Sequence, residues 1–230
     1  KAKEAADRFA ELDGRTPLEA AHTPAMDELC RKGEFFFTHT VPDGFPPGSD
    51  VANMSLMGYD PARYYTGRAP IEAAAMGIRL APDETAFRCN LVTLEYGDHG
   101  RIAMQDFSAG HITSGEARQL IGDLNAECGS EQFQFKPGVS YRHLMIYKGA
   151  LPNLVTVPPH DYIGQDISKY LEAYQQNADW GSLLARAAKL LQDHPVNLHR
   201  IQNGQNPATL IWLWGEGKMP SVPTLTERFN

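Results

Sequence analysis

The chain has 230 residues and a formal net charge of −7, which comes from 21 basic and 28 acidic side chains. Hydrophobic residues make up 42% and charged residues 21%, a balance typical of globular proteins. The basic residues are scattered, which argues against a nucleic-acid-binding surface, and no apolar run approaches the roughly 18 residues that span a bilayer. A few converging arginines still attract anionic metabolites locally, so a small charged ligand stays open.

The cellular setting follows from the N-terminus and the cysteines. Residues 1–7 have no apolar signal-peptide core, so secretion is not indicated. Cys30, Cys89 and Cys128 are odd in number and show no Cys-x-x-Cys spacing, which favours buried free thiols in a reducing compartment. We therefore expect a cytoplasmic protein that makes no membrane or nucleic-acid contact, and the oligomeric state stays open.

The first part of the chain is rich in helix signals. Thr16-Pro17-Leu18-Glu19 predicts a helix that opens on a capping box, and Thr23-Pro24 predicts a second helix that stops at Gly33. The aromatic run 35–38 predicts a buried strand. The stretch 42–48 holds three prolines and two glycines, which excludes regular structure, and a helical pattern then runs from Asp50 to Gly58.

The pattern changes near Phe87, where strand signals become frequent. It predicts a hairpin at 87–95 and 101–105, a helix at 113–127 with a second capping box, strands at 133–136 and 142–147, a helix at 183–191 and a strand at 209–214. The order strand, strand, helix, strand, strand indicates a compact α+β insert.

Ser49 is the first candidate for chemistry. In Pro47-Gly48-Ser49-Asp50 it stands at the predicted cap of a helix, after a glycine that permits close approach of a ligand. First-turn N–H groups and the helix dipole favour a phosphate or an oxyanion there. Serine is also a common N-cap with no further role, and this tetrapeptide alone leaves that interpretation open.

Arginines and histidines are the second group of candidates. The arginine set is Arg63, Arg68, Arg88, Arg142 and Arg200, whose forked donors suit a carboxylate or a phosphate. His111 precedes a helix cap, where it would act as an acid, a base or an oxyanion donor, and His160-Asp161 is typical of a metal or phosphate contact. Each of these side chains has a purely structural alternative. No His-x-x-x-His pair or other metal-ligand spacing occurs in the sequence.

Taken in order, these segments resemble one family. They are residues 12–21, Thr23-Pro24, Met26-Asp27, 47–50, 58–61, Gly67-Arg68, 86–90, 138–143, 158–161, 194–197 and 211–215. The chain is similar over almost its whole length to the archaeal-type, cofactor-independent phosphoglycerate mutases of the alkaline phosphatase superfamily.

The resemblance implies an enzyme that interconverts 3-phosphoglycerate and 2-phosphoglycerate through a phosphoserine intermediate at a two-metal site. Ser49 would be the nucleophile and a metal ligand, and His111, Arg88, Arg142 and Arg200 would contact the phosphorylated substrate. Two divalent ions (manganese, magnesium or zinc) would serve the complete enzyme, as phosphoryl transfer of this kind requires.

The sequence also departs from the family pattern. Residues 3–7 stand where the family has a strand ending in Asp-Gly, Ala25 replaces a usual asparagine, and the family continues past the strand at 211–215 into segments with aspartate and histidine metal ligands. Ser49 alone cannot hold two metals. We therefore expect the chain as given to bind anions weakly without turnover, either as part of a mutase whose missing ligands lie on other segments or as a truncated, metal-free remnant. An enzyme for another phosphomonoester or a phosphonate is the third alternative.

The resemblance also implies a fold. We expect an α/β protein with a partial alkaline-phosphatase-like core at residues 1–86 and 196–230, and an inserted α+β cap at 87–195 that carries the substrate-binding side chains.

Overall fold

The computed structural model describes residues 7–34, 36–45 and 47–229. The chain divides into two compact units, residues 1–40 and 41–230, and each is described by itself. No helix among the described residues is both long enough and apolar enough to cross a membrane.

Among its described residues, the first unit contains three short helices and no buried side chain. They are η1 (Ala10–Leu12), α2 (Pro17–Ala20) and α3 (Pro24–Lys32). The predicted capping box is confirmed, because the Glu19 N–H donates to the Thr16 hydroxyl (3.1 Å) and the Thr16 N–H donates to the Glu19 carboxylate (2.9 Å). The second predicted helix is confirmed as well and ends at Gly33.

The strand predicted at 35–38 is wrong for the residues that the structure describes there. Residues 36–40 form no strand, and Phe36 and Phe37 are 83% and 109% exposed; Phe35 lies outside the described residues. A β-prone run needs a neighbouring strand to pair with and a surface to cover. The aromatic composition alone indicated a buried strand, and no described part of this unit supplies that partner.

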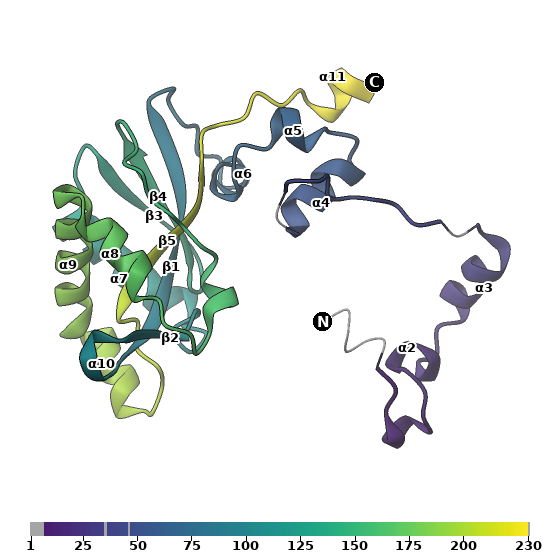
Figure 1. Ribbon diagram of the computed structural model, residues 1–230, viewed down its shortest axis with the longest axis horizontal. Coiled ribbons are helices and arrows are strands. Elements are labelled where there is room, and N and C mark those ends of the chain that lie inside the picture. Colours follow the sequence, from purple (N-terminus) through teal and green to yellow (C-terminus); the bar gives the residue numbers. More distant parts are fainter. Residues whose placement is uncertain (1–6, 35, 46, 230) are drawn as a thin grey trace. The chain divides into compact units, whose positions relative to one another are not determined.

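The second unit combines one sheet with helices on both of its faces (Figure 1). Its elements are α4 (Ser49–Leu56), α5 (Pro61–Tyr64), α6 (Arg68–Ala75), β1 (Glu84–Tyr96), η2 (Asp98–Gly100), β2 (Ile102–Asp106), α7 (Ser114–Cys128), β3 (Phe133–Val139), β4 (Arg142–Lys148), η3 (Pro159–Tyr162), α8 (Ser168–Gln175), α9 (Ala178–Gln192), α10 (Pro195–Gln202), β5 (Leu210–Gly217) and α11 (Leu225–Phe229). The hairpin, helices and strands predicted beyond Phe87 are confirmed, and the mixed α/β class with them.

Strand β1 organises the sheet. It pairs antiparallel with β2, β4 and β5, and β4 pairs in turn with β3. Ten consecutive residues, from Thr85 to Leu94, are buried. A strand covered on both faces is buried continuously rather than at alternate positions, so β1 forms the centre of the unit.

The expected domain division is wrong at its C-terminal boundary. It assigned Leu91 to the inserted cap and Ile211 to a separate core, but Leu91 and Ile211 are register partners in the pairing of β1 with β5. The apolar run of β5 matches the face of β1, and pairing satisfies the backbone groups of both strands. The strands between residues 84 and 217 therefore form one sheet.

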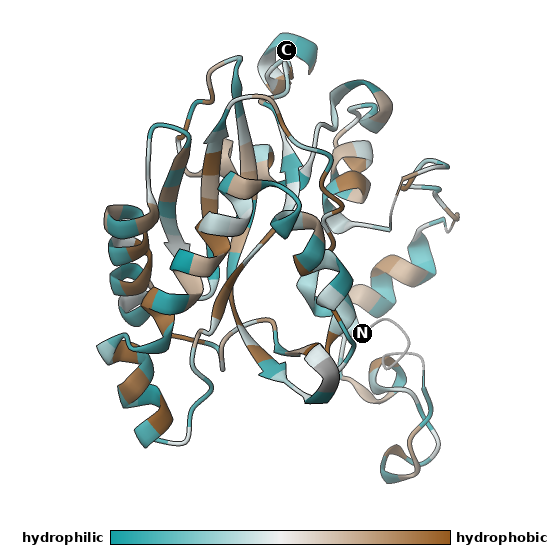
Figure 2. Cartoon of the chain, turned by 60° about the vertical axis from the view of Figure 1, so that its left-hand side comes forward, coloured by the Kyte–Doolittle hydropathy of each residue, from teal (hydrophilic) through white to brown (hydrophobic). Residues whose placement is uncertain are grey.

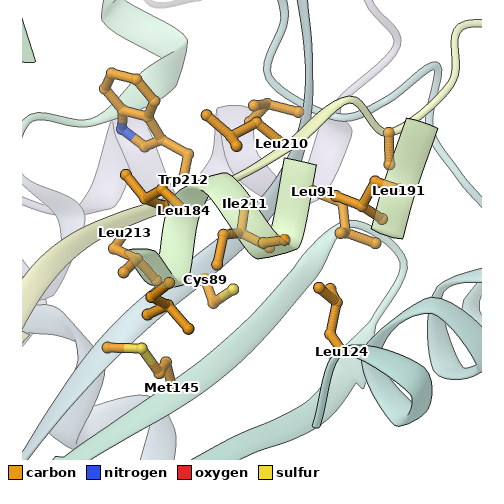
Figure 3. Packing of buried hydrophobic residues seen from close by; sticks show 14 of the residues in the cluster. Cys89, Leu91, Leu124, Met145, Leu184, Leu191, Leu210, Ile211, Trp212 and Leu213 are labelled. Carbon is orange, nitrogen blue, oxygen red and sulfur yellow. The ribbon is translucent and has the colours of Figure 1, made fainter. Parts of the chain in front are cut away.

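The two faces of the sheet carry different chemistry. Cys89 and Leu91 point to the face covered by α7 and α9, where they pack with leucines of both helices and with β5 (Figure 3). Phe87 belongs to the same buried cluster. On the other face Ala86 packs against the small side chains of α6, with Leu144 of β4. Brown, apolar segments run along the strands of the sheet (Figure 2). The predicted buried free thiols are confirmed at Cys89 and Cys128, but the prediction is wrong for Cys30, which is a free thiol at an exposed position.

A close backbone approach fixes α6 on this second face. Gly67 precedes α6 with φ +138°, and a Cβ there would lie 2.0 Å from the carbonyl oxygen of Glu216 in β5. Glycine is therefore required, because any side chain would push α6 away from the sheet. The result is that Arg68, the first residue of α6, stands beside the end of β5.

The buried histidine of β4 makes the stability of the unit depend on pH. His143 is 1% exposed, its Nδ1 accepts the N–H of Gly138 (3.0 Å), and its Nε2 has no partner among the described residues. Burial lowers the pKa of His143 from 6.5 to about 4, although the backbone near Ser140 acts in the opposite direction. The folded state therefore keeps this imidazole neutral.

The free energy of unfolding should fall as the pH is lowered from about 6.5 to about 4. In this range the unfolded chain binds the proton and the folded chain does not, so the effect approaches roughly 3 kcal/mol at about 1.4 kcal/mol per pKa unit. His143→Gln should flatten this dependence in urea titrations, whereas His22→Gln, at an exposed position, should leave it unchanged. An unchanged slope in His143→Gln would contradict the assignment.

Candidate anion-binding site

Ser49 opens α4 but does not cap it. The N-cap is Gly48, and Ser49 is the first helical residue, so the prediction was displaced by one position. Its side chain is exposed, and no group among the described residues hydrogen-bonds to its hydroxyl. The predicted nucleophile thus lies at a helix N-terminus, where first-turn N–H groups favour an anion.

The first turn of α4 is tied to the segment that leads into α6. The Tyr65 hydroxyl donates to the Asp50 carboxylate at 2.6 Å. Burial, together with this hydrogen bond, raises the pKa of Tyr65, and the positive charge of Arg68 opposes the shift. One short stretch therefore links the helix that carries Ser49 to the first arginine of the sheet face.

Arg88 is the centre of that face. It is 5% exposed, and its guanidinium carbon lies 4.6 Å from the centre of the Trp214 ring. The Glu72 carboxylate approaches its Nε at 2.7 Å, but the N–H does not point at the oxygen, so the contact is an ion pair rather than a hydrogen bond. The Arg88 guanidinium is thus positioned by the Trp214 ring and the Glu72 carboxylate, while its Nε has no hydrogen-bond partner among the described residues.

Two further guanidinium groups converge on Arg88. The guanidinium carbon of Arg68 lies 5.5 Å from the Trp214 ring, and that of Arg142 lies 5.8 Å from the Tyr141 ring. Burial lowers the pKa of Arg88; Glu72 opposes this effect, and Arg68 and Arg142 add to it. Three positive groups on one face, with one carboxylate among them, form a site that favours an anion with several oxygens.

Asn90 fixes the aromatic floor of this site. Its side-chain carbonyl accepts the indole N–H of Trp214 (3.1 Å), and its amide donates to the backbone carbonyl of Phe107 (3.2 Å). Asn90 is 2% exposed, and a buried polar group of this kind needs such partners. The asparagine therefore joins β1, β5 and the segment after β2.

A row of rings connects the arginines to both candidate histidines. His160 lies 5.6 Å from Trp214 and 6.1 Å from Phe107, between ring centres. Phe107 lies 5.4 Å from Tyr141, which lies 6.3 Å from His111. The structure thus brings His111, His160, Arg88 and Arg142 to one connected surface, although the first two are far apart in sequence.

Arg200 is not part of this surface. It is 1% exposed, and all of its nitrogens donate within the protein, to the carbonyls of Asn206 and Ala109 and to the Glu116 carboxylate. No donor is left for a substrate, so the predicted substrate contact at Arg200 is wrong. The sequence pattern could not distinguish an arginine that binds a ligand from one whose N–H groups all donate to groups of the protein.

The described residues do not fit a two-metal site. Among residues 7–34, 36–45 and 47–229, no three His, Cys, Asp or Glu side chains gather at one point. Asp50, the carboxylate next to Ser49, is engaged by Tyr65. A divalent ion of this kind needs several oxygen or nitrogen ligands, and the described residues do not supply such a set at one point.

Several residues of the site carry no sequence signal of their own. Glu72 and Asn90 read as ordinary helix and strand positions, and their roles depend on which strand lies opposite. Trp214 was predicted only as a strand residue. Asp106 had a weak signal, a carboxylate at a strand end followed by Ser108, a pattern typical of a side chain that accepts local backbone N–H groups.

Removal of the carboxylate within the arginine group should strengthen anion binding. Glu72→Gln leaves the side-chain shape almost unchanged but frees Arg88 from a competing negative charge. We expect about three- to tenfold tighter binding of inorganic phosphate by this variant, measured by calorimetry at fixed ionic strength.

Glu127→Gln provides the matched control, because Glu127 is an exposed carboxylate near the end of α7, on the opposite face of the sheet. It should bind phosphate as the parent chain does. Weaker binding in Glu72→Gln would mean instead that Glu72 holds the fork of Arg88 in its binding orientation.

Comparisons with known proteins agree on one family. A family model described as 2,3-bisphosphoglycerate-independent phosphoglycerate mutase matches residues 30–197. A curated protein of that name from Methanosarcina barkeri is 51% identical over 95% of this chain and 54% of its own length. A probable 2,3-bisphosphoglycerate-independent phosphoglycerate mutase from Geobacter sulfurreducens is 46% identical over 96% of this chain and 55% of its own length.

A solved structure shares the fold of this chain. The solved structure of the PH0037 protein from Pyrococcus horikoshii superposes with a TM-score of 0.63 at 27% identity, over 96% of this chain and 51% of that one. The chain spans about half the length of the curated relatives it matches. On the family match and the identities together, the chain belongs to the 2,3-bisphosphoglycerate-independent phosphoglycerate mutase family.

Proposed function

We propose that the protein carrying this chain interconverts 3-phosphoglycerate and 2-phosphoglycerate, with Ser49 as the residue that takes up the phosphoryl group. The observation that carries the proposal is the convergence of Arg68, Arg88 and Arg142 on one face of the sheet, inside the segment that the family match covers. A phosphorylated acid has two anionic groups, and bidentate guanidinium donors suit both.

The proposed reaction is a transfer out and back. The Ser49 hydroxyl loses its proton and its oxygen attacks phosphorus, the bond from phosphorus to the 3-oxygen breaks, and that oxygen takes up a proton. The freed glycerate then turns, its 2-oxygen attacks the phosphoserine and loses a proton, and Ser49 regains one. The substrate leaves with the same atoms, and only the position of the phosphoryl group has changed.

The arginine face would hold the glycerate during the turn. Arg88 is held by Trp214 and Glu72, so its fork is preorganised, whereas Arg142 is exposed and free to follow the ligand. His111 lies at the end of the same row of rings and is exposed. An imidazole there would give the proton to one glycerate oxygen and take it from the other.

The proposal also includes the architecture of the whole protein. Residues 84–217, which share one sheet, would form the inserted cap of an alkaline-phosphatase-like enzyme, in place of the division at Phe87 and residue 196. In the complete enzyme two divalent ions, manganese, magnesium or zinc, would supply charge neutralisation at the phosphoryl group.

A second candidate function is anion binding without turnover by the 230-residue chain itself. The observation that favours it is the lack of a metal-ligand cluster among the described residues. A coupled mutase assay on this chain with added manganese, magnesium or zinc separates the two, because robust metal-dependent conversion would exclude the binding-only function. Turnover of another phosphomonoester or a phosphonate, but not of 3-phosphoglycerate, would favour the related-enzyme alternative.

Ser49→Ala tests the nucleophile in the full-length protein that carries this chain. Loss of the attacking oxygen should lower mutase turnover by at least about a thousandfold, in line with the removal of nucleophiles in other enzymes. Folding stability should change by less than about 1 kcal/mol, because the hydroxyl makes no hydrogen bond among the described residues and is not the cap.

Ser55→Ala is the matched control, since it removes a hydroxyl from the same helix at a position where the oxygen has no partner among the described residues. It should retain turnover. Retained turnover in Ser49→Ala would end the nucleophile assignment.

A further inference from the structure

The segment before α7 holds an unusual backbone. Ala109, Gly110 and His111 are consecutive and have φ values of +47°, +65° and +50°. Non-glycine residues rarely adopt this left-handed region, and two of them beside a glycine persist only where the surroundings fix them. Such strain concentrates at functional positions, and this turn ends on a candidate site residue.

Asp106 holds the turn from one side. Its Oδ1 accepts the N–H (2.8 Å) and the hydroxyl (2.6 Å) of Ser108, and its Oδ2 accepts the N–H of Gly110 (2.7 Å) and the side-chain amide of Asn206 (3.0 Å). Burial alone raises the pKa of Asp106, but the hydrogen bonds from Ser108, Asn206 and Gly110 outweigh it, so the pKa is lowered. The carboxylate therefore stays ionised and accepts all four donors.

Arg200 holds the turn from the other side. Its Nη2 donates to the carbonyl of Ala109 (2.7 Å), its Nε to the carbonyl of Asn206 (2.9 Å), and its Nη1 to the Glu116 carboxylate (3.0 and 3.1 Å). Glu116 also accepts the N–H of Thr113 (3.0 Å) in the capping box of α7. Arg200 of α10 thus links the Ala109 carbonyl to α7, through Glu116, and to the segment before β5, through Asn206.

A buried arginine is a costly way to fill space. Removal of a guanidinium from water carries a large desolvation penalty, and apolar residues of similar volume often replace buried ion pairs without loss. What an apolar residue cannot do is donate to the carbonyls of a left-handed turn. The arrangement at Arg200 therefore serves the shape of this turn rather than general stability.

We propose that Arg200 and Asp106 are positioning residues that hold His111 at the substrate face. His111 is exposed, with its ring centre 6.3 Å from Tyr141, the neighbour of Arg142. Relaxation of the turn to ordinary negative φ values would redirect the imidazole away from that ring. This inference rests on the proposed function for its kinetic consequence, whereas the hold on the turn is independent of it.

Gly110→Ala in the full-length protein tests the contact directly. The new Cβ would lie 3.0 Å from Nη2 of Arg200 and 3.2 Å from Cβ of Asn206. Gly204→Ala is the matched control, because Gly204 has nearly the same φ (+67°) and nothing within 4 Å of an added Cβ. The control separates the strain of a positive φ from the loss of the Arg200 contact.

We expect hydrogen exchange of a peptide over residues 107–113 to rise at least about tenfold in Gly110→Ala and not in Gly204→Ala. Mutase kcat should fall at least about tenfold in Gly110→Ala, with KM within about twofold, because His111 acts in the reaction rather than in uniform binding.

Arg200→Lys supplies a second, independent variant. Lysine keeps a positive charge beside Glu116 but cannot serve the carbonyls of Ala109 and Asn206 together. In a double-mutant cycle with His111→Gln, kcat should fall in each single variant, and the double variant should lie within about twofold of His111→Gln. A residue with a general structural role would instead multiply the two losses.

Equal exchange in Gly110→Ala and Gly204→Ala, or multiplicative losses in the cycle, would overturn the inference. A parent protein with no mutase activity would end the proposed function instead. In that case the hydrogen-exchange comparison alone would test the inference. Faster exchange only in Gly110→Ala would support the role of Arg200 and Asp106 in holding the turn, and equal exchange in the two variants would overturn it.

Discussion

The continuous burial of β1 is the constraint on which the rest of the unit depends. A strand covered on both faces sends alternate side chains to opposite sides. Phe87, Cys89 and Leu91 therefore point to the face covered by α7 and α9, and Arg88 and Asn90 point to the opposite face, where α6 lies. A guanidinium and an amide in such positions must find partners, and they find them in Glu72, Trp214 and Phe107.

This arrangement explains how one strand builds both the core and the site. The apolar residues of β1 attach the sheet to α7 and α9, which gives the face with the arginines a rigid support. The hydrogen bonds of Asn90 attach Trp214 and the segment after β2 to β1. The rings between His160 and His111 are therefore held by the same rigid sheet. Substrate-binding groups on packed elements keep their geometry better than groups on isolated loops.

The sequence predicted local structure well and long-range structure less well. The capping boxes at Thr16 and Thr113, the hairpin after Phe87 and the helix over 183–191 are set by neighbours in sequence, and all are confirmed. The strand at 35–38 and the domain boundary failed because both depend on which strand lies alongside, and local patterns do not contain that information.

The site shows the same contrast between sequence and structure. Residue type alone predicted Arg88, Arg142, His111 and His160 as candidate site residues. The structure brings all four to one surface. Arg200 was predicted on the same grounds, but its N–H groups donate to backbone carbonyls and to the Glu116 carboxylate. Residue type indicates what a side chain is able to bind, and only the fold decides whether its donors remain free.

Whether the arginine face binds the substrate can be measured directly from two indole N–H signals in a nuclear magnetic resonance titration of this chain with 3-phosphoglycerate. Trp214 lies under Arg88 and Arg68, whereas Trp180 packs against Phe87 on the face covered by α7 and α9 and serves as an internal reference. We expect a saturable shift of the Trp214 signal while the Trp180 signal stays fixed. A fixed Trp214 signal at saturating ligand, or equal shifts of both, would contradict it.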